Sequence, residues 1–160
     1  MIRFVEEKDM ESLVAIYNYY IENTTCTLEL EALSAGEFGG RVAKITERFP
    51  YLVYEEDGEI LGYAYLNDFN PRGGYRFTAD LSLYVAQDAR GKGIGRALYA
   101  AIEPMAREMG LENIISLITS ENEASLAFHD KLGFERVARI DRIANKFDRW
   151  IGLCYCIKRI

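Results

Sequence analysis

The stretch LSLYVAQDARGKGIGRAL, residues 81–98, decides the fold because it joins a strand to a helix through a turn rich in glycine and positive charge. Residues 90–96 contain three glycines and three cations. A helix N-terminus exposes unpaired N–H groups and carries partial positive charge, so it suits a phosphate. Glycine lets the backbone approach a diphosphate, and arginine or lysine adds charge-assisted hydrogen bonds. The stretch therefore predicts a phosphate cradle, the alternative being a solvated turn.

Two common phosphate-binding motifs do not match this turn. A P-loop ends in Gly-Lys-Ser or Gly-Lys-Thr, which the chain lacks, and a dinucleotide fingerprint needs glycine or alanine where Arg96 or Leu98 stands. The pattern that fits is Arg/Gln-x-x-Gly-x-Gly/Ala, met by Arg90, Gly93 and Gly95. It resembles the pyrophosphate-binding loop of the GNAT superfamily of acyl-CoA N-acyltransferases.

A second segment carries the same resemblance. Asn122 to Phe134, NEASLAFHDKLGF, is similar to that family's Asn-x-x-Ala/Ser helix ending in Leu-Gly-Phe. The resemblance implies a single-domain α/β GNAT fold, with a mixed, mostly antiparallel sheet flanked by helices on both faces. It also implies acetyl-CoA as the donor, held by Leu83, Tyr84, Val85, Arg90, Gly91, Lys92, Gly93, Ile94, Gly95, Arg96, Asn122 and Ser125. Asn122 could alternatively only cap its own helix.

Four further segments resemble the phosphinothricin and methionine sulfoximine N-acetyltransferases within that superfamily: residues 17–29, 48–53, 74–80 and 145–150. The chain departs from them at Leu28, where they tend to carry an aromatic residue, and at Asp80, where they carry glutamate. The resemblance implies a small amino-acid-like amine as acceptor and a homodimer. The substrate residues that it implies are Leu28, Glu29, Arg72, Tyr75, Arg76, Lys146 and Trp150.

Arginine binds a substrate carboxylate in bidentate fashion, which suits the arginines of this set to an amino acid. Alternatively, these residues form a basic rim with an aromatic residue anchored in the core and do not bind substrate.

Asp80 is the candidate base. The alternation of side chains along a strand places it with Ser82 and Tyr84 on one face. Burying a carboxylate in an otherwise apolar strand is unfavourable, so its presence there indicates a function. Amine acetylation needs a group that takes the amine's proton. The resemblance maps the family's proposed catalytic glutamate onto Asp80, whose shorter side chain could act directly or through water. The alternative is an ion pair with Arg76.

His129 is the only histidine, and it shares a helix stripe with Asn122 and Ser125. The resemblance places it where most of the superfamily has a tyrosine that serves the departing thiolate. An imidazole can donate a proton to a thiolate near neutral pH. A structural role is the alternative. Backbone N–H groups of the strand before the cradle are expected to polarise the thioester carbonyl.

Hydrophobic periodicity predicts alternating strands and helices along the chain. Asp9 is predicted to cap the first helix, a capping box at Ser34 and Glu37 to open the second, and Pro104 to kink the third. Strands are predicted at residues 2–5, 51–54, 60–66, 76–85, 113–119, 134–142 and 150–158, and helices at about 10–21, 36–49, 94–109 and 122–132.

Composition bounds the remaining possibilities. The 160 residues suggest one domain over residues 1–160, and 19 Lys+Arg against 25 Asp+Glu give a net charge of −6, which argues against nucleic acid as a partner. No apolar run is long enough for a membrane span or a signal peptide, so we expect a cytoplasmic protein without a membrane partner. Cys154 and Cys156 alternate in a strand as core residues, and no metal site is predicted.

Three other functions remain open at this point. The enzyme could acetylate another amine, such as a polyamine, a peptide or a protein N-terminus. The chain could bind acyl-CoA without catalysis. A hydrolase using Cys26 and His129 is the third, although no nucleophile motif surrounds Cys26.

Overall fold

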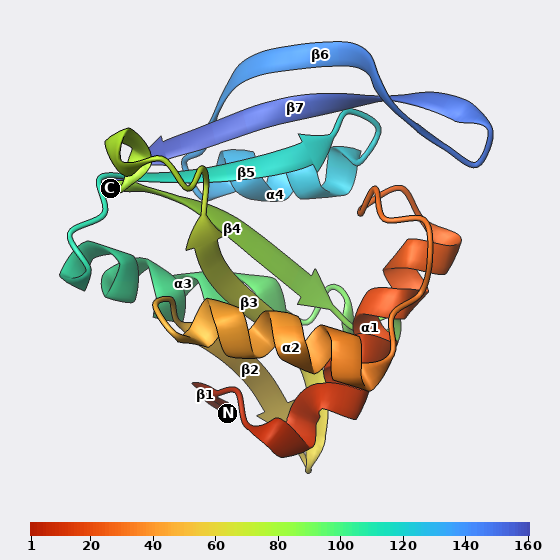
Figure 1. The fold of residues 1–160 in the computed structure, drawn as a ribbon, viewed down its shortest axis with the longest axis vertical. Helices are drawn as coiled ribbons and strands as arrows, with labels where there is room; N and C mark the ends of the chain where they lie inside the picture. Colours follow the sequence, from red (N-terminus) through yellow and green to blue (C-terminus); the bar gives the residue numbers. More distant parts are fainter.

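Alternating apolar residues build seven strands that join in one sheet, in the order β1-β2-β3-β4-β5-β7-β6. The computed structural model describes residues 1–160 (Figure 1). The strands are β1 Ile2–Phe4, β2 Tyr51–Glu56, β3 Glu59–Asp68, β4 Thr78–Val85, β5 Asn113–Thr119, β6 Glu135–Lys146 and β7 Arg149–Arg159. The α-helices are α1 Met10–Asn23, α2 Ala35–Thr46, α3 Ile94–Glu108 and α4 Glu123–Lys131, with short 3₁₀ turns η1 Glu7–Asp9, η2 Gly73–Tyr75 and η3 Gln87–Ala89.

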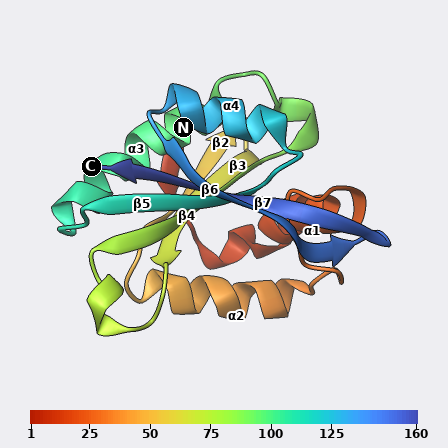
Figure 2. The same ribbon diagram turned by 90° about the horizontal axis from the view of Figure 1, so that it is seen from above.

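The helices cover both faces of the sheet, α1 and α2 on one side and α3 and α4 on the other (Figure 2). A large apolar cluster lies under α3 and α4 and includes Cys154 and Cys156, as predicted. A smaller one under α1 and α2 is rich in tyrosine. All strand pairs are antiparallel except β4 with β5. This confirms the predicted mixed, mostly antiparallel α/β fold. No helix is both long enough and apolar enough to cross a membrane.

The parallel pair β4–β5 is short. Its register covers only Thr78–Asp80 against Asn113–Ile115, although β4 continues to Val85 and β5 to Thr119. Beyond Asp80, β4 pairs only with β3. The two strands diverge in Figure 1, so the edge of β4 that faces β5 lacks a partner strand from Leu81 onward.

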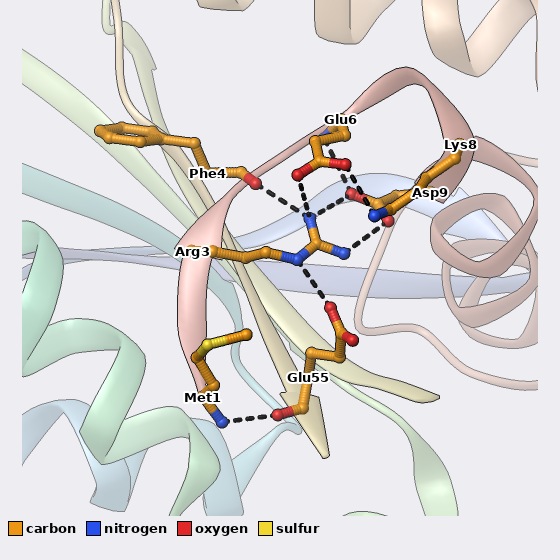
Figure 3. A network of polar contacts seen from close by, with 7 residues as sticks. All are labelled: Met1, Arg3, Phe4, Glu6, Lys8, Asp9 and Glu55. Carbon is orange, nitrogen blue, oxygen red and sulfur yellow. Dashed lines mark hydrogen bonds and ion pairs between the residues drawn. The ribbon is translucent and has the colours of Figure 1, made fainter. Parts of the chain in front are cut away.

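Asp9 is the N-cap residue of α1, as predicted, but its side chain does not cap the helix. Its carboxylate instead accepts two hydrogen bonds from Arg3, both 2.8 Å, and one from the Glu6 backbone N–H (Figure 3). Arg3 also donates to Glu55 at 2.6 Å, and its hydrogen bonds hold the pKa of Asp9 below its usual range. The Asp9 carboxylate is therefore occupied by charge-assisted hydrogen bonds from Arg3 of β1, and Arg3 in turn joins it to Glu55 of β2.

Other boundaries differ more modestly. The capping box at Ser34 and Glu37 is present, but α2 ends at Thr46, and a turn precedes Pro50, which disfavours helix in the residue before it. Pro104 lies within α3 without ending it. The last hairpin is longer than predicted, because β6 reaches Lys146 and turns at Phe147 and Asp148, both with positive φ.

Candidate active site

The turn predicted to be a phosphate cradle lies between β4 and α3. Gly91 and Gly93 have φ of +78° and +80°, a left-handed conformation that favours glycine. Gly93 is the N-cap residue of α3. Because glycine has no side chain that could cap the helix, the first N–H groups of α3 stay free to bind an anion. Gly95 is needed for space, since a Cβ there would lie 3.3 Å from both Leu83 and Phe128.

The cations of the cradle have no acidic partners. Arg90, Lys92 and Arg96 are exposed, and none takes part in an ion pair. The first turn of α3 has no acidic residue. In a chain of net charge −6 this local positive field is suited to a diphosphate. The donors present therefore fit the pyrophosphate of a coenzyme A ester.

The free edge of β4 continues from the cradle. The Ala86 N–H donates to the Leu61 carbonyl, so these two residues form a hydrogen-bonded pair of the β3–β4 ladder. In an antiparallel ladder such pairs alternate with pairs that are not hydrogen-bonded to each other. Leu81, Leu83 and Val85 therefore turn their N–H and carbonyl groups away from β3, toward the unpaired side. The Val85 carbonyl accepts a hydrogen bond from the Tyr20 hydroxyl, which leaves its N–H for a ligand.

Tyr20 contacts the predicted cradle, which its sequence pattern did not indicate because its helical spacing is that of an ordinary core position. Its ring lies 5.2 Å from the guanidinium of Arg90, and Arg90 donates to its hydroxyl at 3.3 Å. Tyr20 thus links α1, the end of β4 and the cradle.

Asp80 lies on β4 where the strands separate. Its register partner is Asn67, and Ser82 and Tyr84 pair with Tyr65 and Tyr63, so Asp80 shares the α1–α2 face of the sheet. Burial raises the pKa of Asp80 to about 7. Such a carboxylate is suited to accept a proton near neutral pH. The alternative ion pair is absent, since Arg76 donates to the Gly73 carbonyl and stacks on Phe77.

His129 is buried in α4, on the opposite face of the sheet. Its ring lies edge-on to Phe128 and Phe134, and Nδ1 lies 2.8 Å from the Ser125 carbonyl oxygen. Because a carbonyl only accepts, Nδ1 carries the proton. Burial lowers the pKa of His129 below 6.5, which favours the neutral ring. Because the proton of that neutral ring is on Nδ1, its Nε2 carries none. The residue must first be protonated before Nε2 can donate to a thiolate.

The loop after α1 is held by contacts from two other elements. Lys146 of β6 donates from Nζ to the Thr27 carbonyl at 2.8 Å, and burial lowers its pKa. Glu121 accepts from the Thr25 hydroxyl, and Asn122 donates to the Cys26 sulfur at 3.3 Å. These contacts fix the loop that carries Leu28 and Glu29, beside α4.

Asn122 also caps α4, with Oδ1 accepting the Ser125 N–H at 3.1 Å. The capping alternative is therefore observed, and a pantetheine contact stays a prediction. Arg149 makes a bidentate pair with Glu121, at 2.6 and 2.7 Å. The role of this pair in holding the loop was not foreseen, since the partners are 28 residues apart.

The structure does not bring all predicted substrate residues together. Arg72, Tyr75 and Arg76 are exposed in the connection from β3 to β4, whereas exposed Trp150 and buried Lys146 lie at the tip of the β6–β7 hairpin. Figures 1 and 2 show these two segments at opposite ends of the molecule. Leu28 is half-buried, and Glu29 accepts from Tyr17 and, at 2.6 and 2.9 Å, from Arg41. Their contact with substrate stays a prediction.

The Cys26–His129 pairing needed by a hydrolase is absent, because the Cys26 sulfur accepts from Asn122 and His129 Nδ1 faces Ser125. No cluster of three or more potential metal ligands is present.

The family model described as an acetyltransferase (GNAT) domain matches residues 2–153. The chain belongs to the GNAT acetyltransferase family. GNAT relatives include a phosphinothricin N-acetyltransferase from Alcaligenes faecalis, 36% identical over 94% of this chain and 77% of the relative. A methionine sulfoximine/methionine sulfone acetyltransferase from Pseudomonas paraeruginosa is 36% identical over 96% and 91%.

Solved GNAT structures match the whole chain. A ribosomal-protein-alanine N-acetyltransferase from Brucella melitensis has a TM-score of 0.97 and 36% identity, covering 100% of this chain and 99% of its own. A phosphinothricin acetyltransferase from Sinorhizobium meliloti, solved with acetyl-CoA, has a TM-score of 0.96 and 31% identity, covering 100% and 88%. This GNAT protein is an N-acetyltransferase, and acetyl-CoA is its acetyl donor.

Replacing Arg90 and Lys92 together with alanine is expected to raise the KM for acetyl-CoA at least tenfold. Each charge-assisted phosphate contact contributes roughly 1.5–3 kcal/mol. Steady-state kinetics at saturating amine measure the effect. Arg107→Ala, at the far end of α3 and paired with Glu103, is the matched control. An unchanged KM in the double variant would remove the cradle from the donor site.

Proposed function

We propose that this GNAT enzyme acetylates the α-amino group of a small amino acid whose side chain resembles those of methionine sulfone, methionine sulfoximine or phosphinothricin. The relatives named for these acceptors support it, as does one observation of the site: Asp80, with a pKa near 7, lies on the sheet face beside the loop that carries Leu28 and Glu29. A binding module without catalysis would not need a half-buried, unpaired carboxylate there.

The chemistry follows from the residues around the free edge of β4. Bound acetyl-CoA supplies a thioester that the substrate amine attacks directly, forming the C–N bond as the C–S bond breaks. Asp80 accepts the proton that the amine loses, directly or through water. The N–H groups of Leu83 and Val85 stabilise the negative charge that develops on the carbonyl oxygen. His129, once protonated, returns a proton to the departing thiolate.

A homodimer in the cytoplasm is part of the proposal. β6 is an edge strand of the sheet, and it carries exposed Val137, Ile140 and Ile143, with Phe147 and Trp150 exposed beside it. An exposed apolar edge of this kind is typical of an interface. All three cysteines are free, as is usual in a reducing compartment. A purely monomeric sedimentation profile would contradict the dimer.

An acetyl-CoA turnover screen tests the acceptor. We expect the highest kcat/KM with methionine sulfone, methionine sulfoximine or phosphinothricin, compared with unmodified amino acids, polyamines and peptides. A peptide with N-terminal alanine belongs in the screen, because the Brucella structure is named for that acceptor. Preference for the peptide or a polyamine would contradict the amino-acid proposal, and coenzyme A binding without any turnover would indicate a binding module.

A further inference from the structure

The hydroxyl of Tyr20 lies between the last residue of β4 and the arginine that begins the cradle. It donates a hydrogen bond to the Val85 carbonyl oxygen, and Arg90 Nε donates a hydrogen bond to it at 3.3 Å. Because a carbonyl only accepts and a guanidinium only donates, the direction of both bonds is fixed. One hydroxyl group from α1 therefore joins the free edge of β4 to the side chain of Arg90.

The ring of Tyr20 is held firmly enough to act as a support. The residue is 5% exposed, and its ring lies edge-on to that of Tyr84 on β4, with the two centroids 5.2 Å apart. The guanidinium carbon of Arg90 lies over the Tyr20 ring, 5.2 Å from the centroid. A cation in this position is attracted to the aromatic face. Arg90 is thus restrained twice, by the hydrogen bond at Nε and by the ring.

This restraint leaves most of the guanidinium free for an anion. A guanidinium carries five N–H donors in one plane, and Tyr20 uses only the donor on Nε. Arg90 is exposed and has no acidic partner, so the four donors on its two Nη atoms are available to a ligand. Because the group is rigid and planar, holding Nε also fixes the direction of those four donors.

We propose that Tyr20 is a positioning residue of the donor site, which holds the Arg90 guanidinium in the orientation that binds the diphosphate of acetyl-CoA. A long side chain that is free in solution loses rotamer freedom when it binds a ligand, and this loss weakens binding. Tyr20 reduces the loss because it restrains Arg90 before the donor arrives. The inference rests on acetyl-CoA as the donor and does not depend on which amine accepts the acetyl group.

Tyr20→Phe tests the proposal, because the substitution keeps the ring and removes only the hydroxyl. A hydrogen bond, or the restraint of one long side chain, is worth about two- to tenfold in binding. We expect the Kd for coenzyme A, measured by titration calorimetry, and the KM for acetyl-CoA to rise about fivefold. The kcat and the amine KM should change by less than about twofold, because the Tyr20 carbonyl still accepts the bond from Thr24 at the start of the acceptor loop.

A double-mutant cycle shows whether Tyr20 acts through Arg90. In an Arg90→Ala background, Tyr20→Phe is expected to change the Kd for coenzyme A by less than about twofold, because the group that Tyr20 orients is gone. A residue that only supports the fold, or that acts only through the Val85 carbonyl, would raise the Kd by the same factor in both backgrounds.

Tyr19→Phe is the matched control. Tyr19 precedes Tyr20 in α1 and the two rings are in contact, with centroids 5.6 Å apart, whereas the hydrogen bonds to Val85 and Arg90 come from Tyr20. The control is expected to bind coenzyme A as the wild type does, and thermal unfolding verifies that each variant is folded.

The outcomes separate this inference from the proposed function. An unchanged or lower Kd in Tyr20→Phe, the same rise in the Arg90→Ala background, or an equal rise in Tyr19→Phe would each overturn the role of Tyr20. None of these results bears on the acceptor. A turnover screen that finds a polyamine or a peptide as the preferred acceptor would contradict the proposed function and leave the role of Tyr20 standing.

Discussion

Asp80→Asn is expected to lower kcat/KM by ~10²- to 10⁴-fold, the usual contribution of a general base. Asparagine keeps the shape of the side chain and removes its basicity. The wild-type pH profile should show a limb near pH 7, because burial raises the pKa of Asp80 to about 7 and only the ionised form accepts a proton. That limb should be absent from the variant. The difference in kcat/KM between the wild type and the variant should become smaller at high pH, because more of the substrate amine is already neutral there.

Two further measurements make the Asp80 prediction specific. Asp80→Glu restores the residue of the resembling enzymes and is expected to retain activity. A carboxylate with a raised pKa in the folded state is stabilising below its unfolded pKa of about 4 and loses that contribution as pH rises through about 7. Asp80→Asn should therefore raise the melting temperature at pH 8 relative to wild type. A variant that changes only the amine KM, with kcat and pH profile intact, would make Asp80 a substrate-binding residue.

His129→Phe is expected to lower kcat by ~10²-fold with little change in either KM, if the imidazole serves the thiolate. Phenylalanine keeps the ring among Phe128 and Phe134 and removes both nitrogens. Pre-steady-state and steady-state rates at saturating substrates measure the loss.

Two amide variants separate catalysis from structure at this position. His129→Asn places a donor near the position of Nδ1 and can keep the bond to the Ser125 carbonyl, whereas His129→Gln places one near Nε2. Recovery in the asparagine variant alone would assign His129 a structural role. A fully active phenylalanine variant would do the same.

The turn that we propose as the donor site could be predicted from local sequence. Arg90, Gly93 and Gly95 lie within six residues, and the conformation of this turn depends on what glycine alone allows: a positive φ at Gly93 and a close approach at Gly95. A strand, a turn and a helix are contiguous in the chain, so their order determines the geometry of the cradle.

Other features were not predicted correctly from local patterns. Asp9 has the sequence pattern of a helix cap, but its carboxylate binds the guanidinium of Arg3 in β1 instead. The hairpin turn at Phe147 and Asp148 lacks the glycine that marks such turns, so the predicted β6 ends at residue 142 instead of Lys146 and the predicted β7 begins at 150 instead of Arg149. Lys146 belonged to a predicted substrate set, whereas its ammonium holds the Thr27 carbonyl 119 residues away.

The sequence by itself determined the family, the acetyl donor and the alternation of strands and helices, because short-range periodicity and glycine geometry are local properties. Only the tertiary structure decided which side chains share a space. It put Asp80 and His129 on opposite faces of the sheet, linked Tyr20 to Arg90, and joined Lys146 of β6 to the Thr27 carbonyl in the loop after α1. These relations arise from strand register and helix packing, which bring together residues that no local pattern connects.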